Sequence, residues 1–184
     1  INTGEKKKKQ KMYDKIEKYE EITDKVEIEI SNYLGKSSQQ EMSEDASMQM
    51  RAMLNVVTDL ERIGDVFYQI SKTLEKKQSD KIWFTPDQRE GLNKLIDLIE
   101  KAFVIMNTNL NLNYKNISME EAISIENDIN KTRNKLRKKH LKTVGSEETN
   151  IEASLIYSTI FSSLERVGDH IINVSEALTG EELE

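Results

Sequence analysis

The chain has 184 residues, of which 33% are charged and 36% are hydrophobic, and its net charge at pH 7 is −6. This acidic excess argues against a dedicated nucleic-acid binder. The absence of cysteine excludes disulfides, thiolate metal ligands and cysteine nucleophiles. No apolar run approaches the roughly 18 residues that a membrane-spanning helix needs, so the chain as given is expected to be soluble.

Apolar residues recur at helical spacing along the chain, which predicts an all-α protein of about five long helices. The first helix is expected over residues 8–34, with a left-handed cap at Gly35. Residues 38–41 read as a capping box and predict the start of a second helix, which reaches about residue 77. Loose apolar spacing over residues 42–53 suggests an irregular start to that helix.

A break at residues 78–85 separates this helix from three others, expected over residues 86–110, 118–144 and 147–179. Thr85 and Gln88 form a capping box around Pro86, which suits the first helical position. The asparagine-rich residues 107–116 are expected to be a loop. Ser118 opens another capping box, and Gly180 is expected to close the last helix. Short connections between amphipathic helices favour an antiparallel bundle.

One motif occurs twice, 104 positions apart: Leu60-Glu61-Arg62-Ile63-Gly64-Asp65 and Leu164-Glu165-Arg166-Val167-Gly168-Asp169. The apolar residues around both copies keep the same spacing, which indicates that a structural unit was duplicated. The second half has three predicted helices and the first half has two, so the first helix of repeat one is missing or lies upstream. The expected organisation is a basic linker (1–11), a first repeat (12–78) and a second repeat (86–180).

The motif places two carboxylates one helical turn apart beside the apolar seam. Glu61 and Asp65 do so in the first copy, and Glu165 and Asp169 in the second. Carboxylates at positions i and i+4 face the same space and can ligate one cation. Arg62 is expected to point almost opposite to the core. A solvated pair of carboxylates remains the alternative to a metal site.

The glycines of the motif need a physical reason, because glycine inside a helix costs about 1 kcal/mol relative to alanine. Gly64 and Gly168 therefore indicate either a close helix approach or clearance for a bound ion. Acidic residues of the first and fourth helices could complete the site: Glu20, Glu21, Asp24, Glu126 and Asp128. A donor set of oxygens alone suits Mg²⁺, Mn²⁺, Ca²⁺ or bridged iron, with zinc as a further option.

Other conspicuous residues carry less weight. His140 lies in a basic run and is expected on the surface, and His170 has no counterpart in the first copy, which has Val66 there. The chain contains no Glu-x-x-His, which counts against a ferritin-like di-iron oxidase. Trp83 and Phe84 are expected to plug the space between helices, with a partner-docking patch as the alternative.

Residues 59–65 and 163–169 resemble the paired signature of the PhoU family, whose members are duplicated three-helix bundles with this motif on the third helix of each repeat. Asn173 and the pair Ser175-Glu176 are similar to the usual continuation of that signature. The resemblance implies a role in phosphate homeostasis, through regulation of uptake and signalling. It also implies metal ions at the acidic motifs, which places Glu61, Asp65, Glu165 and Asp169 as ligands.

The resemblance also suggests a setting, the cytoplasmic C-terminal domain of a sodium/phosphate cotransporter. The start at Ile1, the absent first helix and the lysine run Lys6–Lys11 favour this interpretation, since positive charge flanks spanning helices on the cytoplasmic side. The expected partners are the transmembrane transporter module of the same chain, a nearby membrane surface and, as a further option, a second copy of the chain.

The sequence leaves two other functions to weigh against this one. A free-standing PhoU-type regulator is the second interpretation. A metal-dependent hydrolase is disfavoured, because the stripe has no repeated histidine, no evident general base and no Lys or Arg to hold a substrate phosphate. The chain is therefore expected not to be an enzyme.

Overall fold

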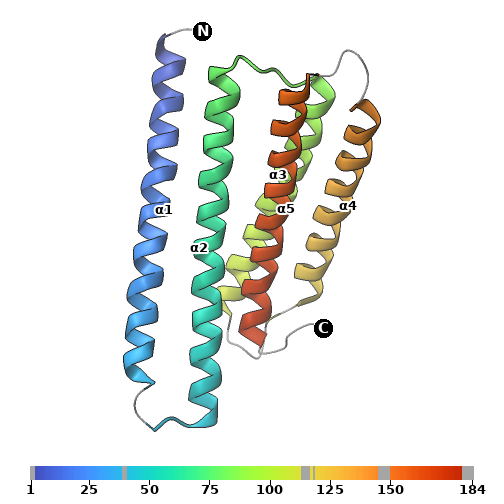
Figure 1. The fold of residues 1–184 in the computed structure, drawn as a ribbon. Coiled ribbons are helices and arrows are strands. Elements are labelled where there is room, and N and C mark those ends of the chain that lie inside the picture. The colour runs from blue at the N-terminus through green and yellow to red at the C-terminus, as the bar shows by residue number, and fades with distance from the viewer. Residues whose placement is uncertain (1–2, 39–40, 113–116, 118, 145–149, 180–184) are drawn as a thin grey trace.

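The computed structural model describes residues 3–38, 41–112, 117, 119–144 and 150–179. Within these residues there are five α-helices: α1 (Thr3–Ser37), α2 (Glu44–Ser79), α3 (Pro86–Asn111), α4 (Met119–Thr143) and α5 (Ile151–Thr179). Consecutive helices run antiparallel in an elongated bundle (Figure 1). The prediction of an all-α bundle is confirmed. None of the helices in the described part of the chain is long and apolar enough to cross a membrane.

The boundary between α1 and α2 differs from the prediction. α1 continues through Gly35, and the Ser38 hydroxyl donates to the Gly35 carbonyl at 2.8 Å. The N-cap of α2 is Ser43, whose hydroxyl accepts the Ala46 N–H at 3.2 Å. The cap at Gly35 and the capping box at 38–41 were therefore wrong predictions. Ser43 is the better cap because acidic residues follow it directly and suit the positive end of the helix dipole.

Two further segments are more regular than expected. Residues 3–11, predicted as a linker, form the first turns of α1, and residues 44–53 are regular helix within α2. Helix geometry continues through residues 5–11 and 44–53 because neither stretch contains a proline or a glycine. α3 also continues through Asn111 into the predicted asparagine-rich loop. The cap expected at Ser118 and the end expected at Gly180 lie outside the described residues.

The start of α3 follows the prediction. The Gln88 N–H donates to Oγ1 of Thr85 at 3.2 Å, and the Thr85 N–H donates to Oε1 of Gln88 at 2.9 Å. Pro86 occupies the first turn, where a missing N–H has no consequence. This reciprocal capping box fixes where the chain turns from the α2–α3 connection into the second repeat.

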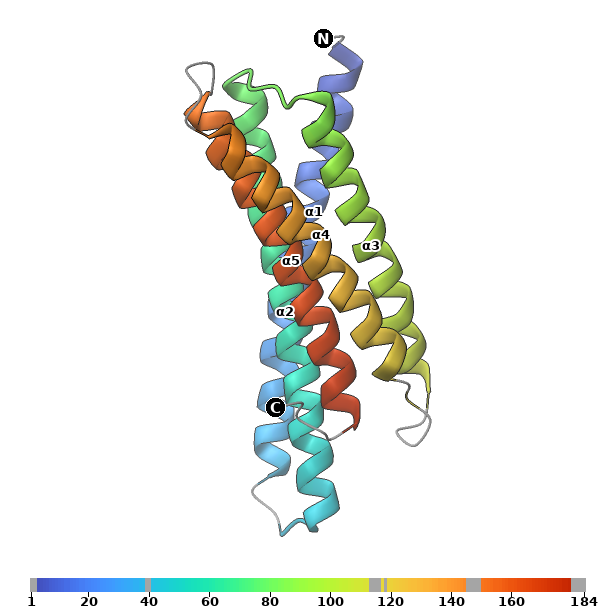
Figure 2. The ribbon, with the colours of Figure 1, turned by 90° about the vertical axis from the view of Figure 1, so that its right-hand side faces the viewer.

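The core is centred on α5, which packs against α2, α3 and α4 (Figure 2). Its most deeply buried apolar side chains come from four helices: Val66, Leu95, Ile129, Val167 and Val174. Burial of one such side chain contributes about 1.5–3 kcal/mol. The position of α5 explains why its motif copy is more enclosed than the copy on α2.

α1 is the peripheral helix, because among the described helices it packs only against α2. Several of its large apolar side chains therefore stay exposed, including Tyr19, Ile22, Val26 and Tyr33. The corresponding helix of the second half, α4, packs against both α3 and α5. The first half thus has two packed helices where the second half has three.

Two aromatic predictions needed correction. His140 is buried rather than on the surface, with Nε2 3.0 Å from Oγ of Ser154 and the ring edge-on to Tyr157. Burial lowers the pKa of His140. Phe84 does plug the core, but Trp83 is 74% exposed. A basic run at the end of a helix is not all surface, since one position per turn faces inward.

Candidate metal centres

The first acidic cluster lies between α1 and α2. One carboxylate oxygen from each of Glu20, Asp24 and Asp65 lies within 4.8 Å of the other two. Partial burial and the nearby charges of Asp65 and Asp24 raise the pKa of Glu61. Partial burial and the same two aspartates also raise the pKa of Glu20. Crowded carboxylates repel one another, so a cation placed among them would stabilise the fold.

Gly64 allows α1 to approach α2 beside this cluster. A Cβ atom at Gly64 would lie 2.7 Å from Oγ1 of Thr23, closer than van der Waals contact permits. The Thr23 hydroxyl donates to the Glu20 carbonyl at 2.9 Å, which holds the threonine side chain in place. Close helix approach is therefore the reason for this glycine, one of the two explanations that the sequence left open.

The second cluster lies between α4 and α5 and contains Glu126, Glu165 and Asp169. Partial burial, followed by the charges of Glu165 and Glu126, raises the pKa of Asp169 from 3.8 to about 6. His170 and Arg133 oppose this effect, and the Arg133 guanidinium also pairs with the Glu165 carboxylate. Asn130 donates to Oε1 of Glu126 at 2.8 Å. The second cluster thus already contains a positively charged side chain, that of Arg133.

The two motif glycines give the register between the repeats. Gly64 faces Thr23, and Gly168 faces Ile129, whose two nearest carbons would lie 3.1 Å from an added Cβ. When α1 and α4 are aligned with Thr23 at the position of Ile129, Glu20 is equivalent to Glu126, Asp24 to Asn130, and Glu27 to Arg133. The first cluster is acidic at all these positions, whereas the second has an amide and a guanidinium. The charge difference lies on α1 and α4, not on the motif helices.

The space between α2 and α5 is a groove of about 570 Å³ lined by both motifs. Arg62, Arg166 and His170 line it together with Glu61, Asp65, Val66 and Asp169. Arg62 is exposed, as predicted from its position opposite to the core, and it nevertheless lines this groove. The carboxylate stripes themselves contain no Lys or Arg, but Arg62 and Arg166 line the groove beside them, which the sequence did not predict. A long side chain on the flank of a helix can bend towards the neighbouring helix, which helical angles alone do not show.

A buried polar contact joins the two repeats next to this groove. Asp59, which is 7% exposed, lies 2.8 Å from Nδ1 of His170 and accepts a hydrogen bond from Nδ2 of Asn173 at 3.3 Å. Asp59 was not among the predicted site residues, because it precedes the repeated motif and its equivalent in the second copy is a serine, Ser163. Comparing that position between the two motif copies would have singled it out.

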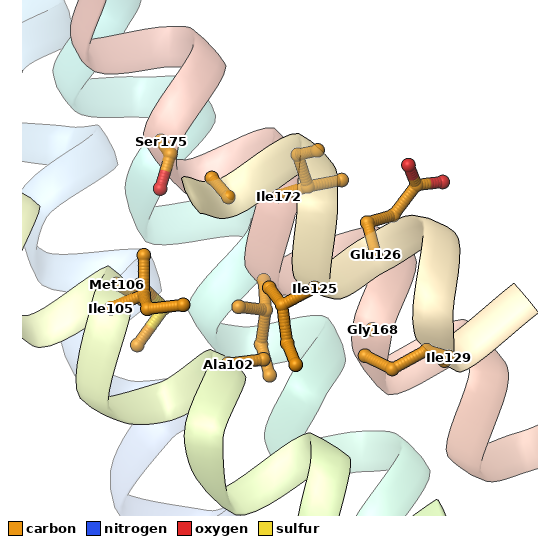
Figure 3. Close-up of a pocket in the computed structure, with 11 residues that line it drawn as sticks. Ala102, Ile105, Met106, Ile125, Glu126, Ile129, Gly168, Ile172 and Ser175 are labelled. Atoms are coloured by element: carbon orange, nitrogen blue, oxygen red, sulfur yellow. The ribbon is translucent and has the colours of Figure 1, made fainter. Parts of the chain in front are cut away.

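The remaining predicted ligands lie in three different places. Asp24 belongs to the first cluster and Glu126 to the second, whereas Asp128 is exposed and pairs with Lys131 at 3.7 Å. Figure 3 shows Glu126 directed away from an apolar cavity lined by α3, α4 and α5. That cavity, of about 10 Å³, has space for one water molecule at most. It is a packing defect beside Gly168 rather than a ligand pocket.

The fold and the two clusters define a class: a duplicated all-α bundle in which each motif helix presents paired carboxylates to a neighbouring helix. The sequence profile of the PhoU domain family matches residues 5–74 and 92–178. The chain therefore belongs to the PhoU family. This match covers both motif copies and both clusters.

A solved structure has the same fold. The crystal structure of the phosphate transport system regulatory protein PhoU from Streptococcus pneumoniae is similar with a TM-score of 0.74. The similarity covers 97% of this chain and 84% of that protein, at 22% sequence identity. No curated protein sequence shows a significant match.

Proposed function

We propose that this chain is a regulatory, non-catalytic domain that controls phosphate transport and binds a metal ion at its first acidic cluster. The PhoU family is a regulatory, non-enzymatic family, and its profile matches both halves of the chain. The observation that carries the metal site is the convergence of Glu20, Asp24 and Asp65 within 4.8 Å. Glu61 lies close enough for both aspartates to raise its pKa.

The proposed ion is a divalent or trivalent cation such as Mg²⁺, Mn²⁺, Zn²⁺ or iron, because the cluster offers oxygen donors alone. The second cluster, with Glu165 and Asp169, binds metal more weakly. Arg133 already pairs with Glu165 there, so a metal ion would have to displace or repel the guanidinium. The two motif copies thus have unequal roles despite their common sequence.

Metal-dependent melting tests this proposal. Excess Mn²⁺, at about 100 times its dissociation constant, should raise the melting temperature of the wild type by about 5–10 °C. Asp65→Asn should remove most of this shift, whereas Asp169→Asn should keep it. Asp128→Asn is the matched control, because Asp128 is an exposed carboxylate outside both clusters. Mg²⁺ and Zn²⁺ are measured in the same way.

Two outcomes would contradict the proposed site. If no metal changed the melting temperature of any variant, the motif would be a duplicated structural element. If Asp169→Asn and Asp65→Asn lost the shift equally, the asymmetry assigned to Arg133 would be wrong.

The proposed setting is the cytoplasmic face of a membrane, beside a sodium/phosphate transporter module of the same chain. The lysine run at the start of α1 supports this setting through the positive-inside tendency. A free-standing PhoU-type regulator is the second candidate, and the family match and the fold agree with it equally well. Deleting residues 12–184 from the intact protein should change phosphate uptake or its response to phosphate supply. Unchanged uptake and response would remove the regulatory role.

A second copy of the chain is the proposed occupant of the exposed apolar face of α1. Tyr19, Ile22 and Val26 lie at helical spacing on this face, and among the described helices only α2 packs on α1. Sedimentation equilibrium of the chain, with and without Tyr19→Glu, tests this contact, and a wild type that stays monomeric would contradict it. Self-association that the substitution abolishes indicates a homo-oligomer.

A further inference from the structure

One end of the bundle differs in charge from the rest of the molecule. The start of α1, the α2–α3 connection, the end of α4 and the start of α5 all lie at this end (Figures 1 and 2). The chain has a net charge of −6, yet this end carries the basic runs Lys7–Lys11 and Arg137–Lys139. The acidic residues of this end include Glu5, Asp14, Glu75, Asp80, Asp87, Glu90 and Glu152, and Glu147 and Glu148 follow in the sequence. Lys139 pairs with Asp87 and Lys76 with Glu152.

A groove between α1 and the end of α2 gathers cations. Lys8, Lys9, Lys77 and Lys81 line it, together with Met12, Tyr13, Ile82 and Trp83. No acidic residue of the described chain lines this groove. Partial burial, followed by the charges of Lys9 and Arg89, lowers the pKa of Lys77. The lining of the groove thus has four lysines and no carboxylate, although Glu75 lies close enough to contribute, after burial, to the raised pKa of Tyr13. This excess of like charge favours an anionic partner.

The same end displays large apolar side chains. Trp83 and Ile151 are each 74% exposed, Leu155 63%, Leu141 59% and Met12 55%. One exposed apolar residue needs no explanation, but several around a single basic end indicate an interaction surface. Tryptophan beside lysine is the composition found where proteins meet the interfacial region of a bilayer.

The exposure of Trp83 follows from the conformation of the turn that contains it. Its neighbours Ile82 and Phe84 are 6% and 8% exposed, so they anchor the segment in the core. Lys81 has a φ of 55°, and the Ile82 N–H donates to the Lys77 carbonyl at 2.9 Å. The ammonium of Lys77 lies 5.7 Å from the centre of the Trp83 ring. The indole is thus held outward beside a cation.

We propose that this end of the bundle docks on the surface of a membrane that contains anionic phospholipids. The lysines of the groove contact the lipid headgroups, and Trp83 enters the interfacial layer. An acidic peptide would neutralise the lysines but would leave Ile151 and Leu155, away from the groove, exposed. The inference rests on the proposed setting beside a membrane and identifies the face that meets it. Its test needs neither metal nor transporter, so its failure would leave the proposed regulation of phosphate transport intact.

Vesicle binding by the chain tests the proposal directly. Trp83 is the single tryptophan of the sequence, so its emission reports on this surface alone. The chain should cosediment with vesicles of equal parts phosphatidylglycerol and phosphatidylcholine, and the Trp83 emission should shift to shorter wavelength. Pure phosphatidylcholine vesicles should bind far less protein, and added salt should release the bound chain.

Matched variants separate this surface from net charge. Changing Lys8, Lys9, Lys77 and Lys81 to Gln should weaken binding to the anionic vesicles on the order of a hundredfold or more, since each lysine near such a surface contributes about fivefold. Changing Lys25, Lys36, Lys101 and Lys131 to Gln removes the same charge elsewhere and should preserve binding. The double variant of Lys8 and Lys9 alone tests the groove at exposed positions that do not support the core.

Several results would overturn the inference. They are no binding to anionic vesicles, equal losses in the two fourfold variants, or binding without a change in Trp83 emission. Competition by free phosphate at millimolar level would assign the groove to a soluble anion. Competition by a poly-glutamate peptide that also shifts the Trp83 emission would assign it to an acidic protein partner.

Discussion

Arg133 and Asp169 show how single side chains set the electrostatics of a cluster. The guanidinium of Arg133 lies where the first repeat has Glu27, and it pairs with Glu165. Asp169 remains close to Glu165 and Glu126, and its pKa rises to about 6. An aspartate with a raised pKa is more easily protonated in the folded chain than in the unfolded chain. Its effect on stability therefore has a definite sign.

The first prediction concerns the pH dependence of folding without metal. Between pH 3.8 and about 6 the folded chain keeps a proton on Asp169 that the unfolded chain has released. The free energy of unfolding therefore falls as the pH rises through this window. Asp169→Asn should be more stable than the wild type at pH 7 by about 1–2 kcal/mol, a value reduced because Asp169 is partly exposed. Below pH 3.8 the two should be nearly equal.

Urea denaturation in the presence of a chelator, at pH 3.5 and pH 7, measures this difference. Asp128→Asn is the control, because Asp128 is an exposed carboxylate outside both clusters. Parallel pH profiles for Asp169→Asn and the wild type would contradict the prediction.

At the scale of the elements, the contact between α1 and α2 depends on Gly64. The helices approach so closely that a Cβ atom there would meet Thr23, whereas a Cβ atom at Gly35 would meet nothing within 4 Å. Both glycines lie inside helices, so both lower helix propensity by about the same amount. Only the packing differs between them.

The second prediction uses that difference. Gly35→Ala should stabilise the chain by about 0.5–1 kcal/mol through helix propensity. Gly64→Ala has the same gain in propensity but must displace Thr23, and should destabilise the chain by about 1–2 kcal/mol overall. Urea midpoints measure both effects. Adding Thr23→Ala to Gly64→Ala should recover part of the lost stability. A Gly64→Ala variant as stable as Gly35→Ala would contradict the prediction, because it would show that α1 can shift away from α2 without loss of stability.

At the scale of the whole molecule, the repeats share a motif but differ in the charge of their partner helices. α1 supplies Glu20, Asp24 and Glu27 to the first cluster. α4 supplies Glu126 at one equivalent position, with Asn130 and Arg133 at the other two. This comparison suggests that the difference in metal binding can be transferred between the repeats.

The third prediction is such a transfer. The double variant Asn130→Asp with Arg133→Glu gives the second cluster the composition of the first. Without metal it should be less stable than the wild type by about 2–4 kcal/mol, because Glu165 loses its partner. Titration calorimetry with Mn²⁺ should show a second binding event, and Mn²⁺ should restore stability.

The reverse pair, Asp24→Asn with Glu27→Arg, is the matched control for this transfer. It should abolish the binding of Mn²⁺ at the first cluster. A double variant of the second cluster that binds no additional Mn²⁺ would show that charge alone does not distinguish the two clusters.

The sequence by itself determined the helical class, the duplication and the capping box at Thr85. These features depend on local properties, namely the helical spacing of apolar residues and side-chain hydrogen bonds over a few positions. It misplaced the start of α2 for the same reason. Residues 38–41 have the pattern of a capping box, whereas the observed cap is Ser43, which is followed directly by Glu44 and Asp45. The capping-box pattern does not take account of these acidic residues in the first turn, so it selected the wrong position.

Only the tertiary structure decided which charged groups meet. The apolar periodicity assigns a residue to one face of its own helix. The axial register between two packed helices depends instead on contacts such as that of Gly64 with Thr23. This register places Glu20 beside Asp65, pairs Arg133 with Glu165 and buries His140. Electrostatic interactions fall with distance, so a shift of one helical turn would change every cluster while leaving the sequence pattern unaltered.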